Sequence, residues 1–190
     1  MAKPKSEDKR NAILASATKV FAERGLSAPT AAITSAARVA EGSLFTYFKT
    51  KDELINALYL ELKLELSDAM MSGFPRKLGV RSRLEHVWNG YVDWGATHPE
   101  GQQVLRQIQV WGGLTESVKA ASAAAFGEFD RIAEDAAAQK AFRDLPMPYI
   151  WAALATLADM TMDFMRRYPD QAGVYRVKGF ELFWSGVARK

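Results

Sequence analysis

Hydrophobic residues recur at helical spacing along almost the whole chain. Near the N-terminus one stripe of this kind consists of Ile13, Leu14, Ala17, Val20 and Phe21. Gly25 follows it and suits the C-terminal cap of a helix. No stretch of alternating β-branched residues bounded by tight-turn pairs indicates a sheet. The pattern therefore predicts an all-α fold.

Breaks at glycine and proline divide the chain into further helices. Pro29 suits the first turn of a short second helix that ends near Arg38, because proline lacks the N–H that would be unpaired there. A third helix is predicted from Glu41 to Tyr47. The segment from Thr50 to Glu53 has the pattern of a capping box and starts a long helix to about Met71. Later helices are predicted near residues 81–97, 100–112, 115–141, 148–168 and 171–188.

Composition and charge add two expectations. The chain has 190 residues, no Cys and a formal net charge of +3. Residues 1–51 hold nine basic and four acidic residues, a net charge of +5, so the remainder carries −2. A basic N-terminal quarter suggests contact with a polyanion, although a solvated tail is the alternative. With no signal-peptide stretch and no apolar run near 20 residues, a cytoplasmic protein is expected.

The second and third predicted helices have the dimensions of a helix-turn-helix unit. The segment from Val39 to Leu54 closely resembles the DNA-binding signature of the TetR/AcrR (tetracycline-repressor) family, a Gly-Thr-Leu-Tyr-x-x-Phe core followed by Lys and an acidic-Leu helix start. The end of the first helix at Gly25 and the apolar Ile33 match the same family, so the resemblance covers about residues 8–60. It implies a helix-turn-helix DNA-binding domain at 1–52 and a helical effector-binding and dimerisation domain at 53–190.

The resemblance also implies that the third helix enters the major groove of DNA. Residues expected to face base edges are Glu41, Gly42, Ser43, Phe45 and Thr46. Phe45 can lie against a thymine methyl, Glu41 can accept from a cytosine amine, and Gly42 permits close approach. Tyr47 and Lys51 match family positions that hold backbone phosphates, and Lys49 and the tail from Lys3 to Arg10 are expected to add salt-dependent affinity. Two alternatives stay open: partial burial of Phe45 and Tyr47, and a Glu41 that only favours the positive end of its helix.

Three positions depart from the family pattern. Ala28, Arg38 and Ala40 stand where the family usually has Thr, Gly and Ser. Two capping hydroxyls are therefore missing, at about 1 kcal/mol each. A non-glycine residue in a turn that needs positive φ is strained. Arg38 is also expected to reach a DNA phosphate.

All five Trp residues lie beyond residue 80. The family resemblance implies a ligand pocket in this part of the chain and a homodimer formed mainly by the last two helices. The candidate pocket residues are the aromatic Trp88, Tyr91, Trp111 and Phe129, with Gln109, Asn89 or Asp93 orienting a ligand. The candidate dimer residues are Ala155, Ala158, Phe180, Phe183 and Trp184. An ordinary aromatic core and burial within one chain are the alternatives.

Catalytic patterns are weak. His86 and His98 have no Glu-x-x-His partner, and no Gly-x-Ser-x-Gly elbow or phosphate-binding glycine loop occurs. Asp159 and Asp163 share a helical face, but no third metal ligand can be named. We expect no enzyme, metal or cofactor and no membrane association. The expected function is a ligand-responsive repressor, released from a palindromic DNA operator by a small apolar or aromatic effector; the alternative is an all-α carrier or enzyme without a DNA function.

Overall fold

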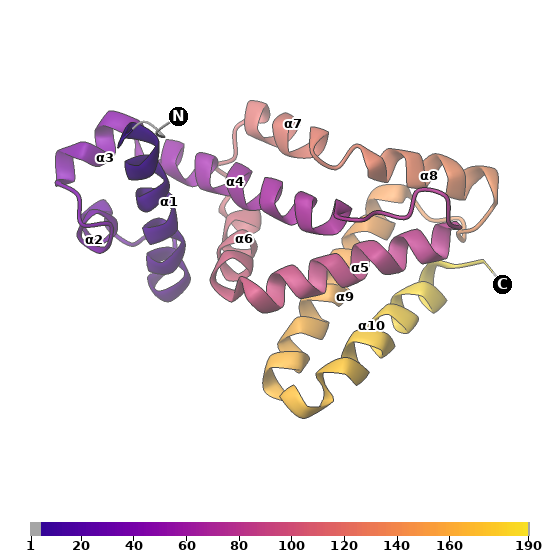
Figure 1. Ribbon diagram of the computed structural model, residues 1–190. Helices are drawn as coiled ribbons and strands as arrows, with labels where there is room; N and C mark the ends of the chain where they lie inside the picture. The colour runs from indigo at the N-terminus through magenta and orange to yellow at the C-terminus, as the bar shows by residue number, and fades with distance from the viewer. Residues whose placement is uncertain (1–4, 190) are drawn as a thin grey trace. The chain divides into compact units, whose positions relative to one another are not determined.

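The computed structural model describes residues 5–189, which form ten α-helices and no strand (Figure 1). This confirms the predicted all-α fold. One isolated antiparallel bridge joins Phe142 and Ala188. The elements are α1 (Lys5–Arg24), α2 (Thr30–Ala36), α3 (Glu41–Tyr47), α4 (Lys51–Met71), α5 (Val80–Thr97), α6 (Pro99–Trp111), α7 (Glu116–Ala124), α8 (Glu128–Ala138), α9 (Met147–Arg167), the 3-10 helix η1 (Pro169–Gln171) and α10 (Ala172–Val187).

The single helix predicted at 115–141 is wrong, because the chain forms α7 and α8 there. A turn at residues 125–127 separates them, with the Phe129 N–H donating to the Phe126 carbonyl at 2.9 Å. Gly127 lies in this turn, and a glycine inside a helix lowers stability by roughly 1 kcal/mol relative to alanine. The hydroxyl of Ser67 also donates to the Ala125 carbonyl at 2.5 Å. The Ala125 carbonyl, in the turn between α7 and α8, thus accepts a hydrogen bond from a side chain of α4.

The described chain divides into two compact units. Unit 1 contains residues 5–64 and 98–123, and unit 2 contains residues 65–97 and 124–189. Helix α4 contributes residues to both units. These units group the helices by their contacts. The predicted boundary between a DNA-binding domain at 1–52 and an effector-binding domain at 53–190 is a functional division and stays a prediction. Among the described residues no helix is long and apolar enough to cross a membrane.

The core of unit 1 joins α1 to the two short helices that follow it. Ile13, Phe21, Ile33 and Leu44 are each fully buried. Helix α6 packs against α1 through two glutamine side chains. Gln103 Nε2 donates to the Ala22 carbonyl at 2.8 Å, and Gln107 Nε2 donates to the Phe21 carbonyl at 3.0 Å. The Ala22 carbonyl lies in the last turn of α1, where carbonyls lack a partner within the helix, and the Phe21 carbonyl also accepts from the Gly25 N–H at 2.9 Å.

The core of unit 2 is built around Trp88, which is fully buried. Its ring stacks on Phe183 with centroids 6.5 Å apart, and its Nε1 donates to the Arg176 carbonyl at 3.0 Å. Helices α5, α9 and α10 pack together at this point. A Cβ on Gly179 would lie 2.7 Å from Trp88 Cζ2 and 2.3 Å from Thr161 Oγ1. The close crossing of α9 and α10 therefore requires glycine at this position.

Candidate nucleic-acid interface

The turn between α2 and α3 has the geometry of a glycine-type helix end. The Val39 N–H donates to the Thr34 carbonyl at 3.0 Å and the Arg38 N–H to the Ser35 carbonyl at 3.2 Å, as in a Schellman motif. Arg38 takes the left-handed position, with φ of 55°. The predicted strain at this residue is thus confirmed, because its Cβ crowds the backbone where glycine would not.

The helix starts around this turn differ in their capping. Pro29 and Ala40 stand at the N-caps of α2 and α3, and neither helix has a side-chain cap hydrogen bond. The sequence predicts Pro29 in the first turn of α2. In the structure Pro29 is instead the residue directly before that helix. Helix α4 has the predicted capping box: the Glu53 N–H donates to Thr50 Oγ1 at 3.0 Å, and Glu53 Oε2 accepts from the Lys49 N–H at 2.9 Å.

Helix α3 has one buried face and one exposed face. Leu44 is fully buried, and Phe48 directly after the helix is 2% exposed. Outside that buried face, the side chain of Phe45 is 47% exposed. The remaining members of the predicted base-contacting set, Glu41, Gly42 and Thr46, are exposed, and Ser43 is half-buried. Partial burial thus applies to Tyr47, which is half-buried, and not to Phe45.

Gly42 has no role in the packing of the protein. A Cβ at this position would meet no atom within 4 Å, and the residue has no positive φ. Alanine would favour the helix by roughly 0.5–1 kcal/mol. A glycine that neither packing nor backbone conformation requires leaves room for the close approach of another molecule.

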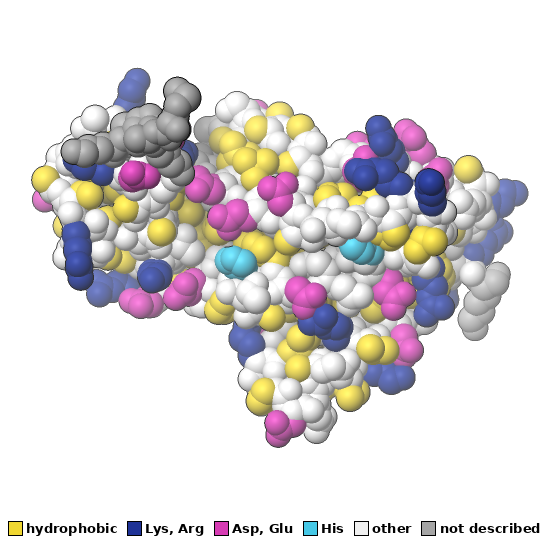
Figure 2. Space-filling model, in the orientation of Figure 1, with side chains coloured by type: hydrophobic (Ala, Val, Ile, Leu, Met, Phe, Trp, Pro, Cys, Tyr) yellow, Lys and Arg dark blue, Asp and Glu magenta, His cyan; other side chains and the backbone are white. Residues whose placement is uncertain are grey.

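Positive side chains accompany this face. Arg38 and Lys49 are exposed, and Lys51 is half-buried with its Nζ 5.8 Å from the centre of the Phe21 ring. Figure 2 shows Lys and Arg side chains around the part formed by α1 to α3, with Asp and Glu side chains among them. Of the predicted basic tail, Lys3 lies outside the described residues. The outer face of α3 is therefore flanked by cations that suit a polyanion.

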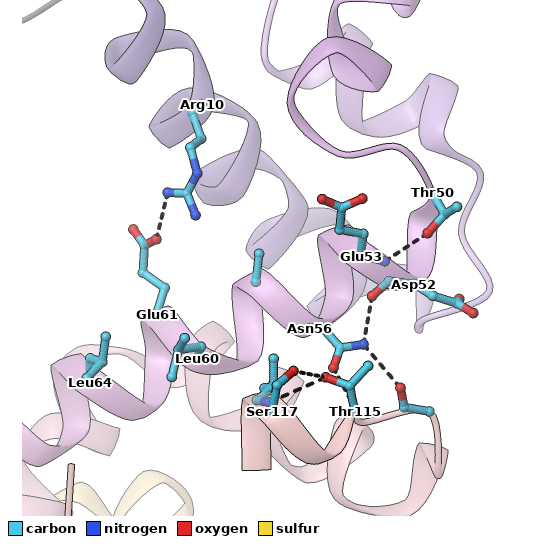
Figure 3. Close-up of a pocket in the computed structure, with 13 residues that line it drawn as sticks. Arg10, Thr50, Asp52, Glu53, Asn56, Leu60, Glu61, Leu64, Thr115 and Ser117 are labelled. Carbon is cyan, nitrogen blue, oxygen red and sulfur yellow. Dashed lines mark hydrogen bonds and ion pairs between the residues drawn. The ribbon is translucent and has the colours of Figure 1, made fainter. Parts of the chain in front are cut away.

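A groove of about 840 Å³ lies in unit 1, between α1, α4 and the segment that joins α6 to α7 (Figure 3). Asn56 holds this segment in place and is 6% exposed. Its Nδ2 donates to the Gly113 carbonyl at 3.1 Å, and its Oδ1 accepts from the Thr115 N–H at 2.9 Å. Patterns along the chain do not reveal this groove, because contacts between residues more than 50 positions apart form its walls.

The structure places the predicted effector residues in both units. In unit 2, Trp88 and Tyr91 are buried, and the Tyr91 hydroxyl donates to Asp159 Oδ1 at 3.1 Å. Asp93 forms an ion pair with Arg176, and Phe129 packs edge-on against Trp151 with ring centroids 5.0 Å apart. In unit 1, Trp111 is half-buried and Gln109 is exposed. None of the six lines the groove of Figure 3 or a second cavity of about 670 Å³ at residues 136–147 and 189. Their role in binding an effector stays a prediction.

The predicted dimer residues are largely buried inside unit 2. Ala158 and Phe183 are fully buried and Phe180 is 3% exposed, whereas Ala155 and Trp184 are half-buried. For the first three, burial within one chain is the alternative that the structure supports. The same two helices and Tyr168, directly after α9, nevertheless expose large apolar side chains; those on the helices are Tyr149, Met160, Phe164, Val174, Val177 and Leu182.

No metal site emerges from the acidic residues of the described chain. Among residues 5–189, no group of three His, Asp or Glu side chains is placed to hold an ion. Asp163 forms an ion pair with Arg166, and Asp159 accepts the hydrogen bond from Tyr91. Both carboxylates of the candidate pair are thus engaged with neighbouring side chains.

The helix-turn-helix geometry and the exposed face of α3 define a DNA-binding protein of the helix-turn-helix class. Residues 13–58 match the family model of bacterial regulatory proteins of the tetR family. Residues 13–58 thus carry the DNA-binding region of this family, and the family match and the shared fold support a DNA-binding transcription regulator. Regulators of this family are generally not enzymes, and the alternative of a carrier or enzyme without a DNA function is not favoured.

Solved structures of regulators share the fold over nearly the full chain. A tetR family transcription regulator from Marinobacter aquaeolei VT8 matches with a TM-score of 0.86 at 18% identity, covering 97% of each chain. A protein of the same description from Shewanella sp. PV-4 has a TM-score of 0.86 at 22% identity, over 96% of this chain and 99% of that one. The transcriptional regulator FadR from Bacillus subtilis, in complex with stearoyl-CoA, has a TM-score of 0.71 at 17% identity, over 93% and 98%.

Proposed function

We propose that this regulator is a homodimeric repressor that binds a near-palindromic operator and is released from it by a small apolar or aromatic effector. Two copies of α3 would enter successive major grooves, about 34 Å apart. The observation that carries the proposal is the outer face of α3. It exposes a large aromatic ring at Phe45 beside Gly42, whose missing side chain nothing within the protein requires.

The contacts to DNA divide into two kinds. Glu41, Ser43, Phe45 and Thr46 face base edges, and the backbone at Gly42 allows α3 to approach them. Tyr47, Lys49 and Lys51 hold phosphates, where a phenolic hydroxyl and two ammonium groups set the register of the protein on the duplex. Lys51 is restrained by the Phe21 ring, which supports a fixed position for its ammonium group.

The exposed apolar side chains of α9 and α10 support the dimer. Val177 and Leu182 on α10 are each 55% exposed, and Tyr149 on α9 is 62% exposed. Large apolar side chains that gather on two neighbouring helices suit an interface between copies of a chain. A two-fold axis through these helices would pair the same surface on both protomers and give a closed dimer.

The effector is proposed to bind within the helical body and to favour a state that fits DNA poorly. The stearoyl-CoA in the Bacillus subtilis FadR structure supports this, because it is held by a protein of the same fold. Release requires that the effector bind the DNA-incompetent state more tightly than the DNA-bound state. Trp88, Tyr91, Trp111, Phe129, Gln109 and Asp93 stay the candidate residues.

The proposal is tested by the salt dependence of DNA binding. Genomic fragments retained at low salt would be titrated with wild-type protein at several salt concentrations, using fluorescence anisotropy. Lys51→Ala should lower the slope of log K against log salt by about 0.9, because one phosphate contact is lost. Lys77→Ala is the matched control, since this exposed lysine lies in the connection between α4 and α5. Failure to retain any fragment at low salt would contradict the proposed function.

A further inference from the structure

The residues of α3 restrict which bases it can read. Its seven residues, Glu41 to Tyr47, are all described and include no Arg, Lys, Asn or Gln. These are the four residue types that read the guanine and adenine edges through paired hydrogen bonds. A helix without them in the major groove has no side chain suited to bidentate reading of a purine. The exposed side chains that α3 does present are a carboxylate at Glu41, a phenyl ring at Phe45 and a hydroxyl at Thr46, which donates to the Gly42 carbonyl at 3.4 Å.

Glu41 selects among the base edges by its charge. Its carboxylate is exposed, and no hydrogen bond or ion pair joins it to another described residue. An ionised carboxylate only accepts hydrogen bonds, and in the major groove the amino groups of cytosine and adenine are the donors. Adenine also presents its N7 acceptor beside the amino group, which opposes a carboxylate. Cytosine presents the amino group without such an acceptor and is therefore the better partner.

Phe45 selects by its apolar surface. Its side chain is 47% exposed in a helix whose inward positions are already filled by Leu44 and, just beyond the helix, Phe48. The C5-methyl of thymine is the apolar group that the major groove offers. Glu41 and Phe45 are four residues apart and lie on the same face, about 6 Å from each other. With about 3.4 Å between base pairs, that distance corresponds to one or two base steps.

The geometry points to an operator that each α3 reads through pyrimidine groups. The N4 amine of a cytosine donates to the Glu41 carboxylate, and the C5-methyl of a thymine lies against Phe45, one or two base steps away. The inference rests on the proposed DNA-binding function and specifies its ligand. It makes cytosine and thymine the specifying bases of each half-site. The flanking cations at Lys49 and Lys51 add affinity that does not depend on sequence.

The thymine contact is tested with duplexes selected from a random-sequence library by the wild-type protein at low salt. Replacing the specifying thymine by uracil removes one methyl group and should weaken wild-type binding about fourfold. The same replacement should have no effect on Phe45→Ala, and it should keep its full effect on Leu78→Ala, an equally exposed apolar residue outside the interface. An equal uracil effect in wild type and Phe45→Ala, or none in wild type, overturns the thymine contact.

The cytosine contact is tested by changing the carboxylate to an amide. Glu41→Gln should move the preferred base at one position of each half-site from cytosine to adenine, by about tenfold, because glutamine pairs with the adenine amino group and N7. Glu85→Gln, on the exposed surface of α5, is the control and should select the wild-type sequence. An unchanged base preference in Glu41→Gln overturns the contact and leaves Glu41 with a role at the helix terminus only.

These experiments separate the failure of this inference from the failure of the proposed function. If the wild-type protein selects no duplex at low salt, the proposed function fails and the inference fails with it. If the protein selects a defined duplex that tolerates uracil for every thymine and whose base preference survives Glu41→Gln, DNA binding stands and the pyrimidine reading is overturned.

Discussion

The outer face of α3 and the core of unit 2 use aromatic residues in opposite ways. Phe45 on α3 is 47% exposed, whereas Trp88 on α5 is fully buried, stacked on Phe183 and hydrogen-bonded to a backbone carbonyl. The ring of Trp88 is packed, and its Nε1 is hydrogen-bonded, entirely within its own chain. The ring of Phe45 has no such role in its own chain and is available for contact with another molecule. Exposure, and not residue type, separates an aromatic side chain available for binding from one that stabilises the fold.

The same difference extends to the backbone. Near α3 two positions are poor choices for folding: a glycine at Gly42 where alanine would favour the helix, and an arginine at Arg38 where glycine would relieve positive φ. In unit 2 the glycine at Gly179 is required, because a Cβ would collide with Trp88 and Thr161. Such positions are not confined to the region of the proposed DNA contact, because Lys140 in unit 2 also has a positive φ, of 50°.

The largest expected effect is on the aromatic core. Trp88→Ala should lower the free energy of unfolding by about 3–5 kcal/mol, because it leaves a cavity among α5, α9 and α10. Phe45→Ala should change it by less than about 0.5 kcal/mol, since the ring is on the surface. Urea unfolding of both variants measures the contrast. Equal losses of stability in the two variants would break the distinction between these aromatic residues.

The next effect concerns the exposed helices of unit 2. Val177→Arg should convert the proposed dimer into a monomer and weaken operator binding by about 100-fold or more, because the second recognition helix no longer binds as part of the same particle. Light scattering gives the mass and anisotropy the affinity. Val110→Arg, on α6, is the matched control, since Val110 is 86% exposed and should tolerate the charge. A dimer that survives Val177→Arg would exclude this face as the interface.

Gly42→Ala should act in opposite directions on stability and binding. The added methyl meets no atom in the free protein, so the free energy of unfolding should rise by up to about 1 kcal/mol. In the complex the same methyl would meet the DNA and should lower affinity about tenfold. Thermal unfolding and anisotropy measure the two effects. Unchanged affinity would show that α3 does not approach the duplex at this residue.

The smallest effect is expected at the turn. Arg38→Gly should relieve the positive φ and raise the free energy of unfolding by up to about 1 kcal/mol. If Arg38 contacts a phosphate, the variant should also lower the slope of log K against log salt by about 0.9. Arg38→Asn is the control, because asparagine tolerates positive φ without the charge. A salt slope unchanged in both variants would assign Arg38 no contact with DNA.

The prediction from sequence succeeded where local rules decide the structure. The boundaries of α3 and α4 follow from the apolar spacing of Leu44 and Phe48 and from the capping box at Thr50 and Glu53, whose hydrogen bonds form as expected. It failed at residues 115–141, where Gly127 and a hydrogen bond from the distant Ser67 accompany a turn that periodicity does not reveal.

Residue order along the chain was sufficient for the all-α fold and the bounds of α3, because both depend on spacing within a few residues, whereas the helix-turn-helix unit was identified mainly by its resemblance to a family. The structure then decided that Phe45 is exposed. Only the tertiary structure decided that Trp88, Phe180 and Phe183 are core residues of one protomer, and that Asn56 holds the segment between α6 and α7. Those arrangements join positions 57 or more residues apart. Apolar periodicity predicts that a side chain is buried, but it does not predict which residues cover it.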